Sequence, residues 1–532
     1  MTRTVDAVVV GSGVNGLVAA AELARAGWSV ALVERNDRLG GFIATEQRTL
    51  PGYLHDTYSS WHPLFVSGGA YATLGEELHR HGLEYRNTDG YFSGTVADDG
   101  RVVLAHRDPA VTVEAFAHAE DRDAYQAMLG RFFDNADAIG GFMGGELRSR
   151  RMLKHVLRLL RQERLSGSEE WLRATLTSAR SYCRSTFRGD ETDLLWAPWL
   201  LHGGLSPDHA SGGLMIPLFA ATMHGFGLPV VAGGAENLVG AFEALLRELR
   251  VDIRTGQPVE RLLLTDGKVT GVICGGETVH ARRAVLASVT PSALYGGLLP
   301  RAAQVPPAVR DQARRFRYGR AAMQIHVALS APPTWNDDRL ADVPLVHLSD
   351  GSASTGIACA EAEAGLLPRR PTVVVGQQHV LDPTRVPPGG AALWLQLQEV
   401  PYVPTGDAAG ELDTTGGWTK ELAEGYARRV LARVARHAPD LADKVLAWDV
   451  VTPDDLASYN PNAVAGDPYG GSAELDQNLL WRPLPGAARH ATPVPGLWQI
   501  GASTHPGPGL GGGSGHMVAQ QLIHNGRRCR RR

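Results

Sequence analysis

Three glycines near the N-terminus, Gly11, Gly13 and Gly16, have the spacing G-x-G-x-x-G. In a strand–turn–helix unit, the first glycine permits a tight turn, the second lets a pyrophosphate approach the backbone, and the third lets the helix pack closely on the strand. Glu34 follows at the end of the next apolar run. A carboxylate there accepts hydrogen bonds from ribose hydroxyls and disfavours a 2′-phosphate. These residue types in this order predict a dinucleotide-binding site.

The segments around the glycines have the pattern of a strand–helix–strand unit. Residues 5–10 form a short apolar run, which is typical of a buried parallel strand. Apolar residues then recur at helical spacing over 17–24, and a second apolar run over 29–33 leads to the acid. A purely structural unit of this kind is the alternative. The complete order of strand, glycines, helix, strand and acid favours the binding site.

A second glycine-rich stretch lies near the C-terminus, with six glycines between Thr504 and His516. Such a stretch is either a flexible linker or a bare backbone against which a large flat group can lie. The segments on both sides, LWQI and HMVAQQLI, have the patterns of ordered elements. They favour the second interpretation.

A further glycine pair, Gly40 and Gly41, follows soon after Glu34, and a nicotinamide dehydrogenase has no general need for it. Here the sequence resembles the superfamily of FAD-dependent amine oxidases and phytoene desaturases, in which such a pair passes beside the diphosphate and the flavin. Residues 229–288 resemble the middle segment of that superfamily, with a Gly-Gly turn, a helix and a hairpin around the turn TDGK. Residues 497–523 resemble its closing flavin-binding motif, a strand, a G-A-x-T-H-P-G turn, more glycines and a helix.

The resemblance implies that FAD is the cofactor and assigns residues to it. The position of Val259 contacts adenine in relatives, and a helix starting near Ser514 would direct its positive end at flavin N1 and the C2 carbonyl. Many relatives carry an acid in the strand-end turn, where this chain has Ala502 and Ser503, so the Ser503 hydroxyl is expected to contact the ribityl chain. His505 in the same loop is the candidate catalytic base. The predicted cofactor-binding residues are Gly11, Gly13, Gly16, Glu34, Arg35, Gly40, Gly41, Val259, Gly501, Ser503, Thr504, Gly511, Gly512 and Ser514.

The fold implied by the resemblance is α/β. A Rossmann-like FAD-binding domain of the three-layer, glutathione-reductase type is expected from residues 1–105, 225–295 and 485–532. An inserted α+β substrate domain with an antiparallel sheet is expected from 106–224 and 296–484. Within it, the runs AAMQIHVALS, TVVVGQQHV and AALWLQLQEV are typical of strands, and an amphipathic helix is predicted soon after residue 420.

Aromatic residues and histidines mixed with many small residues suit a cavity for an extended apolar substrate. The same mixture suits an ordinary core, and both interpretations stay open. A structural role is the simpler one for the two histidines of this group, His202 and His224. The candidate cavity residues are Trp61, Trp199, His202, Phe219, His224 and Phe226.

The activity that the resemblance implies is hydride transfer from a lipophilic, polyene or isoprenoid-like substrate to flavin N5. Two enzymatic alternatives are a flavin amine oxidase and an isomerase or saturase that uses reduced flavin. A third is a protein like the Rab escort and GDP-dissociation-inhibitor proteins, which bind partners and lipids without flavin. The intact glycine clusters and Glu34 argue against it.

The composition is that of a globular protein, with 532 residues, 44% hydrophobic and 20% charged, and the net charge of -4 gives no reason to expect a nucleic-acid partner. The four scattered cysteines suggest neither a metal site nor disulfides, and the N-terminus lacks the pattern of a signal peptide. We therefore expect a cytoplasmic protein. Residues 210–235 carry no charge but include Pro217 and Pro229, which favours a buried segment over a membrane span.

Residues 148–165, RSRRMLKHVLRLLRQERL, form a basic amphipathic pattern. Such a helix can contact an anionic membrane or an acidic carrier protein that presents the substrate. A surface helix that packs its apolar side on its own domain is the favoured interpretation.

Overall fold

The N-terminal unit has the strand–helix–strand order that the glycine motif predicts. The computed structural model of the protein describes residues 3–530, with side chains as far as 526. Strand β1 (Arg3–Val10) leads into helix α1 (Val14–Arg25), and β2 (Val30–Val33) returns parallel to β1, with Ala7 opposite Val30. All four residues of β2 are buried, as expected of a parallel strand covered on both faces.

The first large sheet joins three distant parts of the chain. Its strand order is β10-β11-β12-β1-β2-β9, and β20 pairs with β12. Strands β20, β12, β1, β2 and β9 run parallel, whereas β10 and β11 form the antiparallel hairpin predicted around TDGK. The strands not yet given bounds are β9 (Asp252–Arg254), β10 (Val259–Thr265), β11 (Lys268–Cys274), β12 (Glu277–Ala287) and β20 (Leu497–Gln499).

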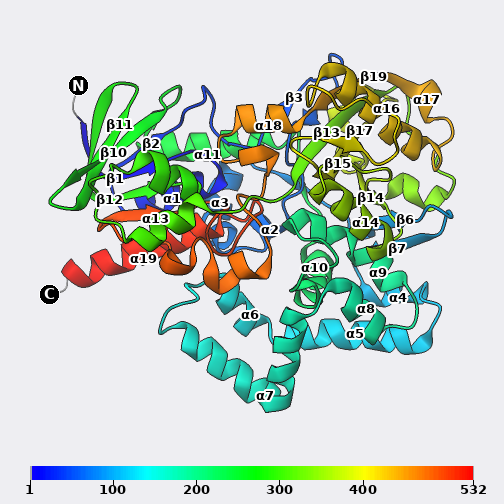
Figure 1. The fold of residues 1–532 in the computed structure, drawn as a ribbon, viewed down its shortest axis with the longest axis horizontal. Helices are drawn as coiled ribbons and strands as arrows, with labels where there is room; N and C mark the ends of the chain where they lie inside the picture. Colours follow the sequence, from blue (N-terminus) through cyan, green and yellow to red (C-terminus); the bar gives the residue numbers. More distant parts are fainter. Residues whose placement is uncertain (1–2, 531–532) are drawn as a thin grey trace.

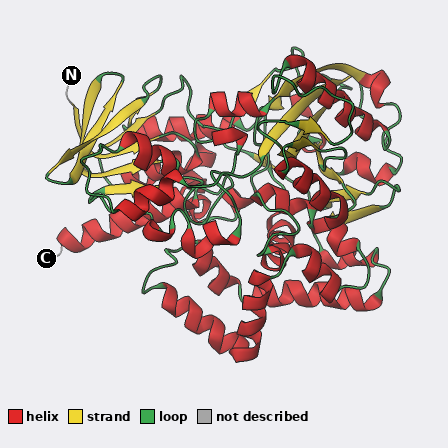
Figure 2. Ribbon diagram, in the orientation of Figure 1, coloured by secondary structure: helices red, strands yellow, loops and turns green. Residues whose placement is uncertain are grey.

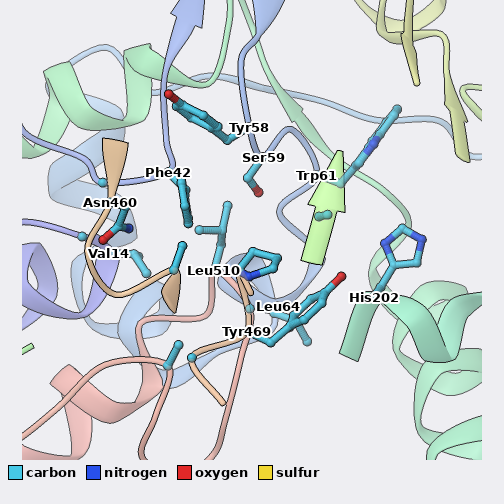
Figure 3. Close-up of a pocket in the computed structure, with 18 of the residues that line it drawn as sticks. Val14, Phe42, Tyr58, Ser59, Trp61, Leu64, His202, Asn460, Tyr469 and Leu510 are labelled. Carbon is cyan, nitrogen blue, oxygen red and sulfur yellow. The ribbon is translucent and has the colours of Figure 1, made fainter. Parts of the chain in front are cut away.

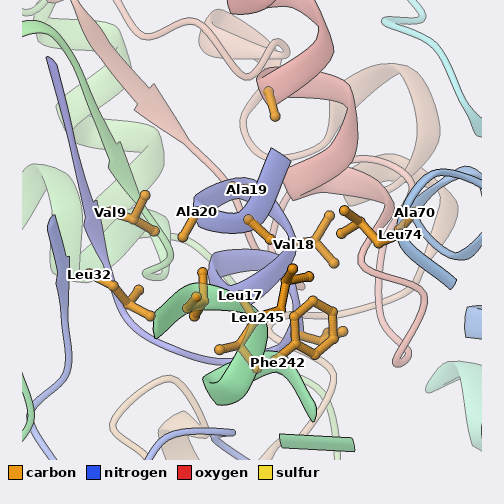
Figure 4. Close-up of a cluster of buried hydrophobic side chains, with 14 of the residues drawn as sticks. Val9, Leu17, Val18, Ala19, Ala20, Leu32, Ala70, Leu74, Phe242 and Leu245 are labelled. Atoms are coloured by element: carbon orange, nitrogen blue, oxygen red, sulfur yellow. The ribbon is translucent and has the colours of Figure 1, made fainter. Parts of the chain in front are cut away.

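Helices cover this sheet and build its core. They are α1, α3 (Gly69–Arg80), α11 (Glu236–Glu248) and α19 (Gly513–Arg530). Figure 4 shows α1 between the strands and α11, with Leu17 of α1, Leu32 of β2 and Phe242 of α11 in one cluster. These three side chains are fully buried, and each contributes about 2 kcal/mol to folding. The prediction of an α/β fold with a Rossmann-like sheet is confirmed.

The second large sheet lies on the other side of the molecule (Figure 1) and has the order β19-β13-β17-β16-β14-β6-β7. Its neighbouring strands are antiparallel except for β14 and β6. Its strands are β6 (Tyr91–Val96), β7 (Val102–His106), β13 (Ala321–Leu329), β14 (Leu345–Leu348), β16 (Val373–Gly376), β17 (Ala391–Val400) and β19 (Val445–Val451). Strands β6 and β7 lie inside 1–105, the segment assigned from sequence to the cofactor domain, yet they pair in this sheet.

The two faces of the second sheet differ in polarity. Met323, Ile325 and Leu395 lie on the face that packs against the predicted amphipathic helix, α16 (Lys420–Ala435). Side chains alternate between the faces of a strand, so Gln324 lies on the opposite face and points away from α16. The strand predicted over TVVVGQQHV is shorter in the structure. Strand β16 ends at Gly376, and the short helix α15 (Gln378–Leu381) follows.

A group of helices lies beside the second sheet (Figure 2), and α7 projects from it at the lower edge of Figure 1. These helices are α5 (Ala119–Asp134), α6 (Ala136–Met143), α7 (Met152–Leu176), α8 (Ala179–Thr186), α9 (Glu191–Trp196) and α10 (Gly212–Phe226). Helix α10 contains much of the uncharged stretch and is mostly buried. Between residues 3 and 530, no helix combines the length and the apolar character that a bilayer crossing requires.

Short elements connect these layers. The two-residue strands pair as β3–β4, β5–β8 and β15–β18. They are β3 (Thr45–Glu46), β4 (His55–Asp56), β5 (Tyr85–Arg86), β8 (Val230–Val231), β15 (Leu366–Leu367) and β18 (Gly406–Asp407). The remaining α-helices are α2 (Pro63–Val66), α4 (Pro109–Glu114), α12 (Pro291–Ala293), α13 (Pro307–Arg314), α14 (Ser352–Glu363), α17 (Leu441–Lys444) and α18 (Pro453–Tyr459).

Candidate active site

The two glycine-rich regions meet in space. A Cβ atom added to Gly16 would lie 1.9 Å from the Gly11 carbonyl oxygen, so α1 starts directly against the turn that precedes it. A Cβ added to Gly515 would lie 2.0 Å from the Asn15 carbonyl oxygen. Only glycine allows approaches this close. The N-terminal turns of α1 and α19 therefore touch, although they are 500 residues apart in sequence.

Glu34 fixes the first turn. Its Oε2 accepts hydrogen bonds from the Ser12 amide at 2.8 Å and the Ser12 hydroxyl at 2.7 Å, and its Oε1 accepts one from the Asn36 amide at 3.0 Å. The carboxylate is buried at the carboxyl end of β2, the edge at which parallel sheets bind dinucleotides.

Two other predicted residues lie near this edge. The chain before Val259 runs alongside β2, because the Gln257 amide donates to the Glu34 carbonyl at 2.9 Å. Val259 begins β10 and is partly buried. Arg35 is exposed to solvent.

Hydroxyl groups shape the C-terminal turn. The Ser514 hydroxyl accepts a hydrogen bond from the Gly501 amide at 3.1 Å and lies 2.7 Å from the Thr504 hydroxyl. The Ser503 hydroxyl donates to the Gly470 carbonyl at 2.7 Å. These contacts hold the turn open beside the first glycine cluster.

Arg482 supports the same turn, and no sequence pattern predicted this role. Its guanidinium is buried and donates to the Ala502 carbonyl at 2.6 Å and the Tyr469 carbonyl at 3.0 Å. Burial lowers the pKa of Arg482 to about 10, although Asp467 opposes this shift. The side chain therefore remains charged at neutral pH and ties residues 469 and 502 together.

A cavity of about 270 Å³ runs from the glycine bends to the polar face of the second sheet. Figure 3 shows Val14, Phe42 and Asn460 on one side of it, and Trp61, Tyr469 and His202 on the other. Residues from both glycine regions line it, namely Gly13, Gly40, Gly41, Gly501, Ser503 and Gly509. All lining residues belong to the described part of the chain, and they include no Asp, Glu, Lys or Arg.

The structure brings four of the six candidate cavity residues to this cavity, namely Trp61, Trp199, His202 and Phe219. His202 Nε2 lies 3.1 Å from His347 Nε2, so one imidazole donates to the other. Burial lowers the pKa of His202 to about 3 and that of His347 well below its usual value. Both rings are therefore neutral at physiological pH.

The other two candidates, His224 and Phe226, lie elsewhere, and their assignment to the cavity is corrected. His224 is buried, with Nε2 at 2.7 Å from the Tyr125 hydroxyl and Nδ1 at 2.8 Å from the His106 carbonyl oxygen. Phe226, at the end of α10, is 44% exposed. Both follow a long buried segment, so their sequence context did not distinguish a cavity wall from a core or a helix end.

The assignment of His505 as a catalytic base also needs correction. Its Nε2 lies 2.8 Å from the Phe142 carbonyl oxygen and donates to it, and within the described chain His505 is not among the cavity-lining residues. Burial lowers its pKa to about 4. The ring connects the C-terminal loop to α6.

Several cavity residues were missed from sequence, and the second sheet supplies five of them, namely Ala322, Gln324, Trp394, Gln396 and Gln398. A signal was present in the runs AAMQIH and LWLQLQ, where polar or aromatic residues occupy every second position. In a strand this alternation places them on one face.

Known proteins match this chain over nearly its whole length. The family described as flavin containing amine oxidoreductase matches residues 15–523. The rat pyridine nucleotide-disulfide oxidoreductase domain-containing protein 2 is 26% identical, over 98% of this chain and 93% of that protein. The neurosporene-forming phytoene desaturase of Rhodobacter capsulatus is 24% identical, over 97% and 93%. A solved putrescine oxidase bound to putrescine shares the fold, with a TM-score of 0.61 and 17% identity, over 98% of this chain and all of that one.

The glycine turn fits the diphosphate of FAD. A Cβ added to Gly13 would meet no atom within 4 Å, so open space lies beside the turn at the start of α1. The unpaired amides and dipole of a helix N-terminus favour phosphate in such a space. The chain therefore belongs to the family of flavin-containing amine oxidoreductases and is an FAD-dependent oxidoreductase.

Proposed function

We propose that the protein removes a hydride from a C–H bond of a lipophilic, polyene or isoprenoid-like substrate and passes it to flavin N5. The observation that carries the proposal is the uncharged cavity, which connects both glycine bends to the aromatic and amide side chains of the second sheet. One relative is named as a phytoene desaturase, which supports a lipophilic substrate.

The predicted cofactor-binding residues keep their roles in this proposal. Gly11 and Gly13 would border the diphosphate, Gly16 would let α1 start close to it, and the Glu34 carboxylate would accept hydrogen bonds from the ribose hydroxyls. Val259 would lie next to the adenine. The bare segment would face the isoalloxazine ring through Gly509 and Leu510, which line the cavity, while Gly511 and Gly512 let it pack against Leu64 and Val18.

The protein's own groups orient the substrate and exclude water. FAD supplies the hydride acceptor. Trp199 and Phe219 close the cavity with apolar surface, and hydride transfer depends chiefly on holding the C–H close to the acceptor. The proton released by the substrate passes to a nearby neutral base or to water. His202 is neutral and lines the cavity.

We assign the cofactor domain, of the three-layer glutathione-reductase type, to segments near 1–90, 225–295 and 485–532. The pairing of β6 and β7 in the second sheet supports this end of the first segment, before Tyr91 rather than at residue 105. The substrate domain is the inserted α+β part, 91–224 and 296–484, with the antiparallel sheet.

We also place a peripheral contact with an anionic membrane on α7. Leu153 and Leu157, one turn apart on this projecting helix, are 59% and 43% exposed, which supports a contact over self-packing. Exposed basic residues, Lys154 and Arg161 among them, flank the leucines and would pair with lipid headgroups. A cytoplasmic protein docked in this way could take a lipophilic substrate from the bilayer or from a carrier.

Anaerobic titration of the purified holoprotein tests the activity. A substrate that is dehydrogenated should bleach the oxidised flavin absorption with one equivalent of substrate per flavin. We expect bleaching by polyenes or isoprenoids and none by amines such as putrescine. Bleaching by amines alone would assign amine oxidation. Turnover only after pre-reduction of the flavin would assign isomerisation or saturation.

A further inference from the structure

The second sheet presents a row of amide side chains to the cavity, opposite the glycine bends. Gln324 on β13 stands directly across from Gln396 on β17, and Gln398 follows two residues later on the same face. All three line the cavity, together with Trp394. We call Gln324, Gln396 and Gln398 the amide row.

Two members of the amide row have carbonyl oxygens without a donor. Gln324 is 2% exposed; its Nε2 donates to the Tyr58 carbonyl oxygen at 2.5 Å, while its Oε1 has no hydrogen-bond partner. The bond to Tyr58 requires a donor, so the amide orientation is fixed and Oε1 remains an acceptor. Gln398 is 3% exposed, and its Oε1 also lacks a partner, although its side chain lies beside the Tyr469 hydroxyl, which lines the same cavity. Buried acceptors of this kind are destabilising until a donor reaches them.

The cavity also limits which group can supply that donor. An ammonium or carboxylate would lose its hydration without gaining a counter-charge, because the lining residues carry no formal charge. His202 supplies no counter-charge either, because burial lowers its pKa and keeps the ring neutral. A pure hydrocarbon leaves both oxygens unpaired, and a ketone or aldehyde only accepts hydrogen bonds. A neutral hydroxyl donates to Oε1 and accepts from a neighbouring amide N–H.

We propose that the amide row is a subsite for a neutral hydroxyl group, so that the substrate is an alcohol-bearing lipophilic chain rather than a plain hydrocarbon or an amine. The inference rests on the proposed function, because it names the substrate class of the same cavity. The hydroxyl contacts Gln324 and Gln398, and the apolar part of the chain lies against Trp199 and Phe219. This anchoring fixes which C–H bond of the chain faces the flavin side of the cavity.

Equilibrium binding to the holoprotein tests the subsite without turnover. The probes are farnesol, the hydrocarbon in which a methyl group replaces its hydroxymethyl group, and farnesylamine. Binding is followed by the change in flavin absorption and by quenching of tryptophan fluorescence, since Trp61, Trp199 and Trp394 line the cavity. We expect farnesol to bind at least about tenfold more tightly than either other probe, because only it pairs the buried acceptors.

Matched variants assign the preference to the amide row. Gln324→Leu and, separately, Gln398→Leu should reduce the preference for farnesol to about threefold or less while hydrocarbon binding is kept or improved. Gln126→Leu makes the same change at an exposed position on α5 and should keep the wild-type preference. Flavin content shows that each variant is folded, and the wild-type comparison stands alone if one variant does not fold.

Three results would overturn the subsite: farnesol no tighter than the hydrocarbon in the wild type, including no binding of either; an unchanged preference in both leucine variants; or tightest binding of farnesylamine. These results are separable from failure of the proposed function. A protein that prefers farnesol but whose flavin no compound bleaches keeps the subsite and loses the dehydrogenase. A protein whose flavin is bleached by polyenes without any alcohol preference keeps the dehydrogenase and loses the subsite.

Discussion

Arg385 Nη1 donates to Asp56 Oδ2 at 2.6 Å, and both side chains are almost completely buried. This ion pair joins the loop after β16 to the strand β4 that leads into the cavity loop. Asp56 Oδ1 also accepts from the Ala235 amide at 2.7 Å, and Arg385 Nη2 donates to the Val231 carbonyl at 2.6 Å. Three segments distant in sequence therefore meet at one buried pair.

Arg385→Met should destabilise the protein by about 3–5 kcal/mol, because it leaves the Asp56 carboxylate buried without its charge partner. Urea unfolding followed by fluorescence and circular dichroism measures the change. Arg385 Nε also lies 3.3 Å from Asp382 Oδ2, and that carboxylate keeps its charge in either variant. Asp56→Asn combined with Arg385→Met removes the other two charges and should therefore recover only part of the loss. A single variant as stable as the wild type would show that the pair does not hold these segments together.

Gly13→Ala and Gly16→Ala should separate cofactor affinity from folding. A Cβ at position 13 meets no protein atom, whereas one at position 16 lies 1.9 Å from the Gly11 carbonyl oxygen. We expect Gly13→Ala to fold normally but to bind FAD at least about tenfold more weakly, or about 1.4 kcal/mol. Gly16→Ala should lose about 1–3 kcal/mol or more of stability through overpacking.

Titration of the apoproteins with FAD and their thermal unfolding measure both quantities. Gly130→Ala, at a position on α5 where an added Cβ meets nothing, is the control. It should leave FAD affinity unchanged and raise stability by about 0.5–1 kcal/mol, because alanine favours a helix interior over glycine. Unchanged FAD affinity in Gly13→Ala would mean that the diphosphate does not lie against this turn.

Stability should fall as the pH drops from about 6.5 towards 4, in part because of His224. Burial lowers its pKa in the folded protein to about 4, from an ordinary value of 6.5. Between pH 4 and 6.5 the His224 imidazole is protonated in the unfolded chain but neutral in the folded chain, so a fall in pH favours unfolding. The slope from one such group reaches about 1.4 kcal/mol per pH unit.

His224→Asn should reduce this pH dependence, since asparagine does not titrate. His118→Gln, at an exposed position, is the matched control and should leave the dependence as it is in the wild type. The measurement is the free energy of unfolding of the wild type and both variants between pH 4 and 6.5. An identical slope in wild type and His224→Asn would contradict the prediction.

Binding to anionic vesicles should depend on the basic residues of α7. Lys154→Glu with Arg161→Glu is expected to weaken co-sedimentation with phosphatidylserine-containing vesicles at least about tenfold, because each basic side chain near such a surface contributes about 1 kcal/mol. Arg314→Glu with Arg428→Glu reverses two exposed charges elsewhere and should have little effect. Full binding by the α7 variant would place the contact on another surface. No binding by the wild type would rule out a membrane contact.

Local patterns in the sequence determined the cofactor half. The spacing of Gly11, Gly13, Gly16 and Glu34 predicted the β1–α1–β2 unit, because each residue acts on its immediate neighbours in the chain. The hairpin β10–β11 and the helix α19 followed from turn residues and periodicity in the same way. Even the resemblance to flavoproteins rested on these short segments.

Only the tertiary structure decided what surrounds the substrate. The amide row depends on the pairing of β13 with β17 and on which face of that sheet packs against α16. Neither relation is local in sequence. For the same reason His224 and His505, plausible site residues by position, turned out to bind Tyr125 and the Phe142 carbonyl instead. A side chain's neighbours are set by long-range packing, whereas a glycine turn is set by its own backbone, so the sequence revealed the cofactor turns while the cavity required the fold.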